Sequence, residues 1–512
     1  MSPLGQSPID RLMDAVDRMR PPAAAPLRRQ GCWAAACLLL AAAVITLCSK
    51  SSPLYPFNDW VDANCYLTIG HGILRGQMPY RDLIDHKGPL LYLLHAPAAA
   101  LDPAGFFGVY LLEILAAAGF LLAALCLLRL YGGRRTALAL PLLAAVVYGC
   151  GSFCHGDSAE ELCLPLLAWP LYWSLRAVRA GKIPPAADCL KIGLCAGAVL
   201  WIKFSLLGLF AGLLPVPILL GIRRRQGHSL LIGAAAALGG LLAVTLPLFV
   251  WLACGGALDD CLSIYLHDNL FLYSSSAPGF FPEVLFNRLI NGLSDALPRD
   301  PLVFPLILLG GTWLALCEKS RAVYHLLCAF FGLLLTVYGG GRHYPYYALP
   351  FTLFTIFGFA ALRQLPSLRA VLPARRGISA AAGVLTLVLS LSTLCLYAPN
   401  AYMRAYSREE LPQFRFAATI AASEERTLLS YGCADGGFYT AAGAEPVCRY
   451  FCTLNLPLAD MHTAQREAVD EGRAAFLVIR NTPVYFDNYR LLDTASFPYE
   501  GRIHTYYLYG RR

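Results

Sequence analysis

Ionisable residues crowd into one short stretch of this 512-residue chain, between two apolar segments. The stretch, residues 58–95, reads NDWVDANCYLTIGHGILRGQMPYRDLIDHKGPLLYLLH. A carboxylate there can accept a proton, and a lysine can hold a phosphate. Such a pairing suits group transfer from a phosphate ester. The ionisable residues of the stretch include Asp59, Asp62, Arg75, Arg81, Asp82, Asp85, His86 and Lys87.

Apolar residues are interleaved with these charges in the pattern of helices that lie along a membrane surface. Over 63–74 the residues Tyr66, Leu67, Ile69, Ile73 and Leu74 fall roughly on one helical stripe. The segment HKGPLLYLLHAP then returns to the apolar phase, with Gly88–Pro89 as the start of a helix. We therefore expect a site at the boundary between lipid and water.

Two further clusters and one lysine also combine ionisable residues with apolar neighbours. Placing an ionisable group at membrane depth costs free energy, so such groups are candidates for a functional role. For the acidic pair at 160–161 an alternative is that it only complements a helix dipole. For Lys203 an alternative is that it only extends to the interface. We expect the charges in the 254–300 loop to be solvated surface. The candidates are His155, Asp157, Glu160 and Glu161 in CHGDSAEELCLP, Lys203 in WIKFSLL, and Arg342, His343, Tyr344, Tyr346 and Tyr347 in GGGRHYPYYALP.

The composition of the chain is typical of a protein embedded in a membrane. Hydrophobic residues make up 57% of the chain and charged residues only 14%, against about 25% charged in a soluble protein. We predict a mainly α-helical polytopic membrane protein with about eleven transmembrane helices, each approaching the length a bilayer needs. The predicted spans are 32–49, 106–128, 136–150, 160–178, 189–203, 204–222, 229–253, 301–317, 322–338, 344–362 and 377–398, of which 136–150 and 189–203 are short.

Basic residues set the orientation, because Lys and Arg near span ends accumulate in the cytoplasm. They favour a cytoplasmic N-terminal segment (1–31), a transmembrane domain (32–398) whose first outer loop is 50–105, and an extracytoplasmic segment 399–512. Residues 9–19 have the spacing of a short amphipathic helix on the inner leaflet. The net charge of +8 then reflects topology, and no nucleic-acid partner is expected.

After residue 398 the pattern changes to that of a small α/β domain. We predict strands at 427–432, 446–451, 474–480 and 504–510, and helices near 411–425 and 457–471. YGCADGG at 431–437 lacks a following helix pattern and is best explained as a tight turn. Cys433, Cys448 and Cys452 can form a disulfide, with the pairing open. No Cys or His group has the spacing of a metal site.

The segments GILRGQMPYRD, from Gly72, and HKGPLLY, together with an early Asp, resemble the first outer loop of bacterial GT-C glycosyltransferases. Members of this superfamily similar to this chain include protein O-mannosyltransferases and the aminoarabinose transferase of lipid A. The resemblance extends over about residues 32–400 and is most specific over 59–95. It implies two amphipathic helices in the first outer loop and, often, a soluble outer C-terminal domain.

The resemblance also implies the activity: transfer of a sugar from a polyprenyl-phosphate donor to a hydroxyl of a lipid, glycan or protein on the outer face. The family's catalytic Asp falls on Asp62 in DANCY, with Asp59 as a competitor, and its donor-phosphate lysine falls on Lys87 in KGP. Many relatives have a second acidic residue where this chain has Ala63, so Glu160 or Glu161 is the candidate for that carboxylate. Some superfamily members use a divalent metal, which leaves a metal open here; no other cofactor is expected.

The mechanism that fits is an inverting displacement with Asp62 as general base. Two other classes remain: a transporter or flippase, although no two halves of the chain match, and a non-catalytic envelope scaffold. The sugar, the acceptor and the oligomeric state stay open. Phosphate stabilisation is assigned to Lys87, Lys203, Arg342 and His343, and the substrate groove to Tyr66, Arg81, Asp85, His86, Tyr344, Tyr346 and Tyr347.

Overall fold

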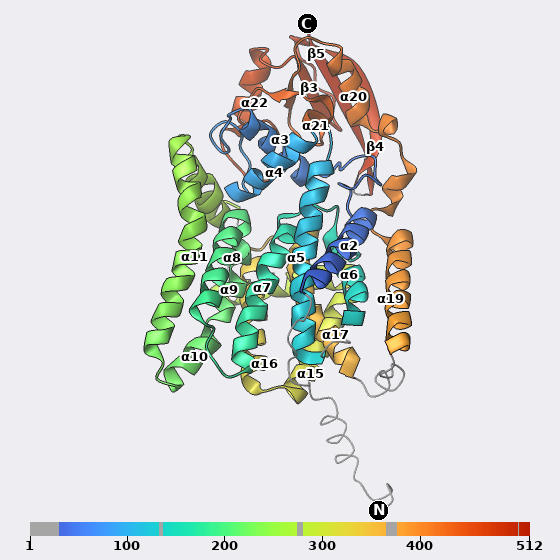
Figure 1. Ribbon diagram of the computed structural model, residues 1–512. Helices are drawn as coiled ribbons and strands as arrows, with labels where there is room; N and C mark the ends of the chain where they lie inside the picture. Colours follow the sequence, from blue (N-terminus) through green and yellow to red (C-terminus); the bar gives the residue numbers. More distant parts are fainter. Residues whose placement is uncertain (1–29, 133–136, 274–279, 365–375, 500) are drawn as a thin grey trace, which may run out of the picture.

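The computed structural model describes residues 30–132, 137–273, 280–364, 376–499 and 501–512. A bundle of helices carries a small sheet domain at one end, and helices α3 and α4 lie between the two (Figure 1). The expected amphipathic helix at 9–19 lies outside the described residues. The bundle helices are α2 (Gln30–Cys48), α5 (Phe107–Gly132), α6 (Leu140–Tyr148), α7 (Ala159–Arg179), α8 (Ala186–Lys203), α9 (Gly208–Leu213), α10 (Pro215–Arg223), α11 (Gly227–Cys254), α14 (Phe281–Arg299), α15 (Val303–Cys317), α16 (Ser320–Tyr338), α17 (Thr355–Gln364) and α19 (Arg376–Tyr397).

Every predicted span has a helical counterpart, but the count of about eleven is not confirmed. Among the described residues, six helices are long and apolar enough to cross a membrane, or seven if α14 and α15, bent by 111°, form one broken span. Four other apolar helical segments are shorter, and α7 carries charges at both ends. The predicted short span at 189–203 is longer than expected, because α8 begins at Ala186 and a 3-10 turn continues it to Leu206. The protein is therefore a multi-pass membrane protein.

Small residues bring α8 and α11 into close contact. A Cβ atom on Gly193 would lie 1.9 Å from the carbonyl oxygen of Ala237, and one on Gly240 would lie 2.2 Å from that of Leu190. Helix association in lipid depends on such close packing, since the lipid offers no hydrophobic driving force. Near the C-terminal end of α8, where Lys203 lies, Trp201 continues the contact by donating to the hydroxyl of Thr245 on α11 at 2.9 Å.

The first outer loop forms two helices, α3 (Val61–Leu74) and α4 (Pro89–Leu101), which pack against each other. A Cβ atom on Gly70 would lie 2.8 Å from the carbonyl carbon of His95, so only glycine allows this crossing. Both helices lie at the end of the bundle that carries the sheet domain (Figure 1). The two helices of the charged stretch thus lie between the helical bundle and the sheet domain.

The C-terminal segment forms one five-stranded sheet in the order β2-β1-β3-β5-β4. β1 is parallel to β2 and β3, whereas β5 is antiparallel to β3 and β4. The strands are β1 (Thr427–Ser430), β2 (Glu445–Pro446), β3 (Phe476–Arg480), β4 (Tyr489–Tyr499) and β5 (Arg502–Arg511), accompanied by α20 (Pro412–Ala421), α21 (Phe438–Ala442) and α22 (Met461–Asp470).

Sequence patterns missed β4 and extended β2 too far. The tight turn expected in YGCADGG is present at residues 431–432, but the expectation that no helix follows was wrong, because α21 begins directly after the segment. Gly437 has φ +91°, and a Cβ atom there would lie 2.8 Å from the Oδ1 atom of Asn64 on α3. The glycines therefore allow the sheet domain to approach the first outer loop.

Candidate active site

Asp62, in the first turn of α3, receives three hydrogen-bond donors on one carboxylate oxygen. Its Oδ2 atom lies 3.4 Å from the Nζ atom of Lys87, 3.2 Å from the hydroxyl of Tyr66 and 3.1 Å from the hydroxyl of Tyr346. In the described part of the chain no donor reaches Oδ1. The carboxylate is thus held in place through one oxygen while the other remains available.

Lys87 owes its position to the glycine that follows it. The N–H of Gly88 donates to the carbonyl of Ile202 at 3.1 Å, and a Cβ atom on Gly88 would lie 2.1 Å from the carbonyl oxygen of Trp201. This close approach brings the loop against the end of α8. Burial favours the neutral amine of Lys87, but the surrounding acidic groups, Asp62 foremost with Asp85 and Glu160, together outweigh burial and raise the pKa of Lys87 above its usual value.

Lys203 lies on the same side of the bundle and is also paired. Its Nζ atom donates to Oε1 of Glu160, which is buried at the start of α7. The ammonium also lies 4.2 Å from the ring centre of Tyr347 and 5.1 Å from that of Tyr346. An ion pair and two aromatic faces therefore stabilise a buried cation here.

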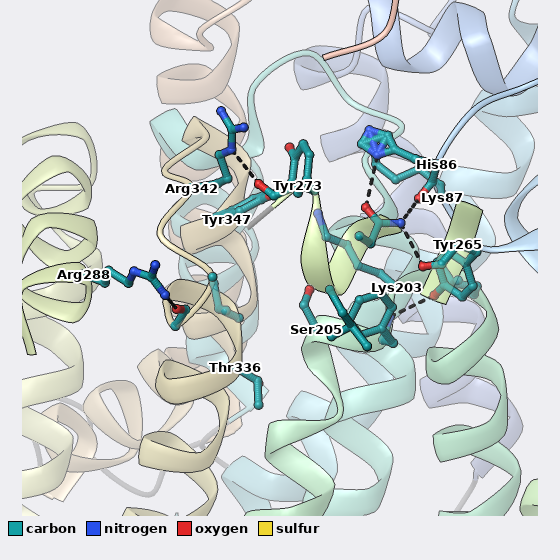
Figure 2. Close-up of a pocket in the computed structure, with 17 residues that line it drawn as sticks. His86, Lys87, Lys203, Ser205, Tyr265, Tyr273, Arg288, Thr336, Arg342 and Tyr347 are labelled. Carbon is teal, nitrogen blue, oxygen red and sulfur yellow. Dashed lines mark hydrogen bonds between the residues drawn. The ribbon is translucent and has the colours of Figure 1, made fainter. Parts of the chain in front are cut away.

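A cavity of about 320 Å³ extends beside these lysines (Figure 2). Its described lining contains four basic side chains, Lys87, Lys203, Arg288 and Arg342, and no Asp or Glu. In Figure 2, His86, Lys87 and Lys203 lie on one side and the two arginines on the other. Arg342 donates to the carbonyl of Tyr273 at 2.9 Å, and its guanidinium lies 4.9 Å from that ring's centre. The cavity is suited to an anion.

A second cavity, of about 220 Å³, contains Asp62 in its wall. We refer to it as the Asp62 cavity and to the first as the cationic cavity. Aromatic side chains of the membrane domain form one part of the wall, and the sheet domain contributes Ala434, Asn455, Arg480 and Tyr499. Asn455 donates to the hydroxyl of Tyr344 at 2.9 Å, which ties the two parts together. The pair formed by Asp62 and Lys87 therefore lies where the two cavities approach each other.

Several residues predicted for the site occupy other surroundings. Asp59 forms a buried ion pair with Lys50 at 2.6 Å. Asp85 accepts a hydrogen bond from Tyr92 at 2.9 Å, and Arg81 is exposed and pairs with Asp82. None of these residues lines either cavity, and neither do Glu161 or His343.

The other predicted residues lie at the two cavities or in contact with their walls. His86 packs on Tyr273, with ring centres 4.9 Å apart, and burial lowers its pKa below the usual value. Glu160 contacts the site through Lys203, and Tyr66 through Asp62. Tyr347 lines the cationic cavity, whereas Tyr344 and Tyr346 line the Asp62 cavity.

The 254–300 region, whose charges we expected to be solvated surface, contributes residues to the site. Asn269, Tyr273 and Arg288 all line the cationic cavity. Asn269 donates to the backbone oxygen of His86 at 2.7 Å, and Arg288 to that of Gly339 at 2.7 Å. The amphipathic pattern of α14, with Arg288 among apolar residues, was the available signal. Arg480, in a strand of the sheet domain, had no comparable signal.

A cluster of three or more His, Cys, Asp or Glu side chains that could hold a metal ion does not occur among the described residues.

Comparison with known proteins identifies the fold. The chain matches no protein-family model and no curated protein sequence. The crystal structure of ArnT from Cupriavidus metallidurans bound to undecaprenyl phosphate is similar to it with a TM-score of 0.55 and 14% identity, over 93% of this chain and 97% of that one. The apo structure of the same protein gives a TM-score of 0.52 and 15% identity, over 88% and 92% of the two chains. The resemblance to GT-C proteins is thus confirmed for the fold.

Proposed function

We propose that this protein is a membrane glycosyltransferase that moves a sugar from a polyprenyl-phosphate donor to an acceptor hydroxyl on the outer face of the membrane. The observation that carries the proposal is the pairing of one carboxylate, Asp62, with a cation-lined cavity at the end of a membrane bundle. The similar fold of a protein solved with undecaprenyl phosphate supports the choice of donor.

The cationic cavity is the proposed site of the donor phosphate. Four cations without an acidic residue in the lining favour a phosphate that gains charge as it departs. Lys87 and Lys203 come from one side and Arg288 and Arg342 from the other, so opposite oxygens of a phosphate can be contacted together. The exposed apolar residues of the surrounding helices favour a lipid chain beside the cavity.

The Asp62 cavity is the proposed site of the acceptor hydroxyl. Its wall contains the carboxylate, aromatic rings suited to the face of a sugar, and Arg480 and Asn455 from the sheet domain. Asp59, held by Lys50 in a buried ion pair, is the weaker candidate for the base. Glu160 and Glu161 act as partners of Lys203 and of the loop before α7 in this proposal, without contacting substrate.

The proposed step is a direct displacement. The acceptor hydroxyl transfers its proton to Oδ1 of Asp62 while its oxygen forms a bond to the anomeric carbon. The bond from that carbon to the phosphate oxygen breaks, and the polyprenyl phosphate leaves with the electron pair. Lys87 and its cationic neighbours stabilise the charge that it gains. One displacement inverts the configuration at the anomeric carbon.

The test is turnover by purified protein in detergent. Polyprenyl-phosphate sugars with a radiolabelled sugar are incubated with a membrane extract as the source of acceptors, and released label is followed. Asp62→Asn keeps the shape of the side chain but removes the base, so transfer should fall by at least about 10² while donor binding persists. Asp59→Asn is the matched control and should retain transfer if it folds. Normal transfer by Asp62→Asn would overturn the assignment, and no turnover of any donor by the wild type would overturn the function.

A further inference from the structure

Two cysteines from distant parts of the chain meet where the first outer loop contacts the sheet domain. The Sγ atoms of Cys65, on α3, and Cys452, in the sheet domain, lie 3.6 Å apart. Both side chains are buried. All 18 cysteines are free thiols in this structure, so Cys433, Cys448 and Cys452 are not bonded to one another. The sulfur of Cys452 instead contacts that of Cys65, in the first outer loop of the membrane domain.

Two other contacts between the same parts of the chain hold this interface in register. One helical turn beyond Cys65, the hydroxyl of Thr68 donates to Asp435 at 2.7 Å. The N–H of Ile84 donates to the carbonyl of Arg449 at 2.9 Å. We call these contacts, together with the sulfur pair, the α3 seam. Because they fix the two segments independently, the proximity of the thiols follows from the docking and not from one mobile side chain.

We propose that Cys65 and Cys452 are a modification site, joined by a disulfide that ties the sheet domain to helix α3. The proposal rests on the outer placement proposed above, since disulfides form and persist outside the reducing cytoplasm. The sulfurs must approach by about 1.5 Å to reach the length of a disulfide bond, a movement within the range of small side-chain rotations.

The oxidation is balanced by a second protein. One thiolate attacks the disulfide of an extracytoplasmic thiol oxidase, and the other cysteine resolves the mixed disulfide. The cysteine pair loses two electrons and two protons, and the oxidase disulfide becomes a dithiol. Because both thiols are buried in the docked state, we expect exchange before the seam closes. The closed seam then shields the bond from reductants.

The experiment uses the full chain with a protease recognition site inserted after the exposed Ser407, between the two cysteines. Membranes are prepared in N-ethylmaleimide to block free thiols, and the protein is purified, cleaved in its folded state and denatured without reductant. The wild-type fragments should stay joined at the mass of one full chain and separate when reductant is added. Cys65→Ser and Cys452→Ser should separate without reductant, whereas the matched control Cys433→Ser should stay joined.

Separate wild-type fragments, or joined fragments in Cys452→Ser, would overturn the proposal. A bond that forms only when diamide is added to the purified protein would also overturn it, and would point to a fault in the outer placement and not in the sulfur geometry. The cleavage readout does not depend on sugar transfer. A joined wild type without transferase activity would therefore leave the disulfide in place and remove the proposed function alone.

Discussion

At the scale of single residues, Lys87 has two roles that depend on each other. It donates to Asp62 and lines the cavity assigned to the phosphate. Its ammonium is buried, so a nearby anion is needed to keep it charged. One lysine therefore connects the proposed base with the proposed leaving group.

Replacing Lys87 by Ala should weaken donor binding by about 10- to 100-fold, the effect of losing a charge-assisted hydrogen bond. Equilibrium binding of a labelled polyprenyl-phosphate sugar to purified protein measures this. Arg81→Ala is the matched control, because Arg81 belongs to the same loop but is exposed and lines neither cavity. Equal losses of donor affinity in both variants would mean that the overall positive charge of the loop, and not Lys87 itself, attracts the donor.

Asp435 should make the α3 seam sensitive to pH. Burial raises its pKa to about 6 in the folded protein, above about 4 in an unfolded chain. The stability that protonated Asp435 contributes to the folded protein is therefore fully present below about pH 4, and it is lost as the pH rises through about 6. Asp435→Asn stays neutral, so at pH 7.5 the variant should be more stable than the wild type by about 1–3 kcal/mol.

Thermal unfolding measured from pH 4 to 7.5 tests this, and the advantage of the variant should disappear toward pH 4. Asp470→Asn, at an exposed ion pair with Arg466, is the control and should leave the shape of the pH profile unchanged. A profile that Asp435→Asn does not flatten would refute the role given to this carboxyl.

At the scale of elements, the join between the first outer loop and α8 determines the site. Gly88→Ala would place a methyl group 2.1 Å from the carbonyl oxygen of Trp201. The loop must then move away from α8, which should lower stability by about 1–3 kcal/mol and reduce donor affinity together. Gly239→Ala in α11 has open space around its added Cβ and should change neither property. Thermal unfolding and the donor-binding assay on both variants check the expectation.

Element-scale patterns were also where sequence reasoning succeeded and failed. The helices carrying Asp62, Glu160 and Lys203 were placed correctly, because long apolar periodicity and Gly-Pro signals are local. The role of Arg480 could not be found, because its side chain reaches the Asp62 cavity through packing between segments far apart in the chain. The amphipathic pattern around Arg288 was a local signal, but the pattern does not show which cavity the side chain lines. β4 was missed because its exposed and buried positions do not follow a simple alternation of apolar and polar residues.

At the scale of the whole molecule, the orientation of the bundle remains a prediction that a fusion experiment can test. Alkaline phosphatase is active only outside the cytoplasm, so a fusion after Arg512 should be active. A fusion after Arg225 should be inactive, because the connection between α10 and α11 lies at the opposite end of the bundle (Figure 1). The reverse pair of activities would invert the topology and place the proposed site on the inner face.

The size of the Asp62 cavity affects how much of the donor is lost to hydrolysis. Its volume of about 220 Å³ has room for several water molecules, since one needs only about 15 Å³ of such space. A base that can deprotonate an alcohol there can also activate water, which would release the free sugar and waste the donor. The ratio of transfer to hydrolysis then depends on how fully the acceptor displaces water from the cavity. Because the sheet domain supplies part of the cavity wall, it limits hydrolysis as well as binding the acceptor.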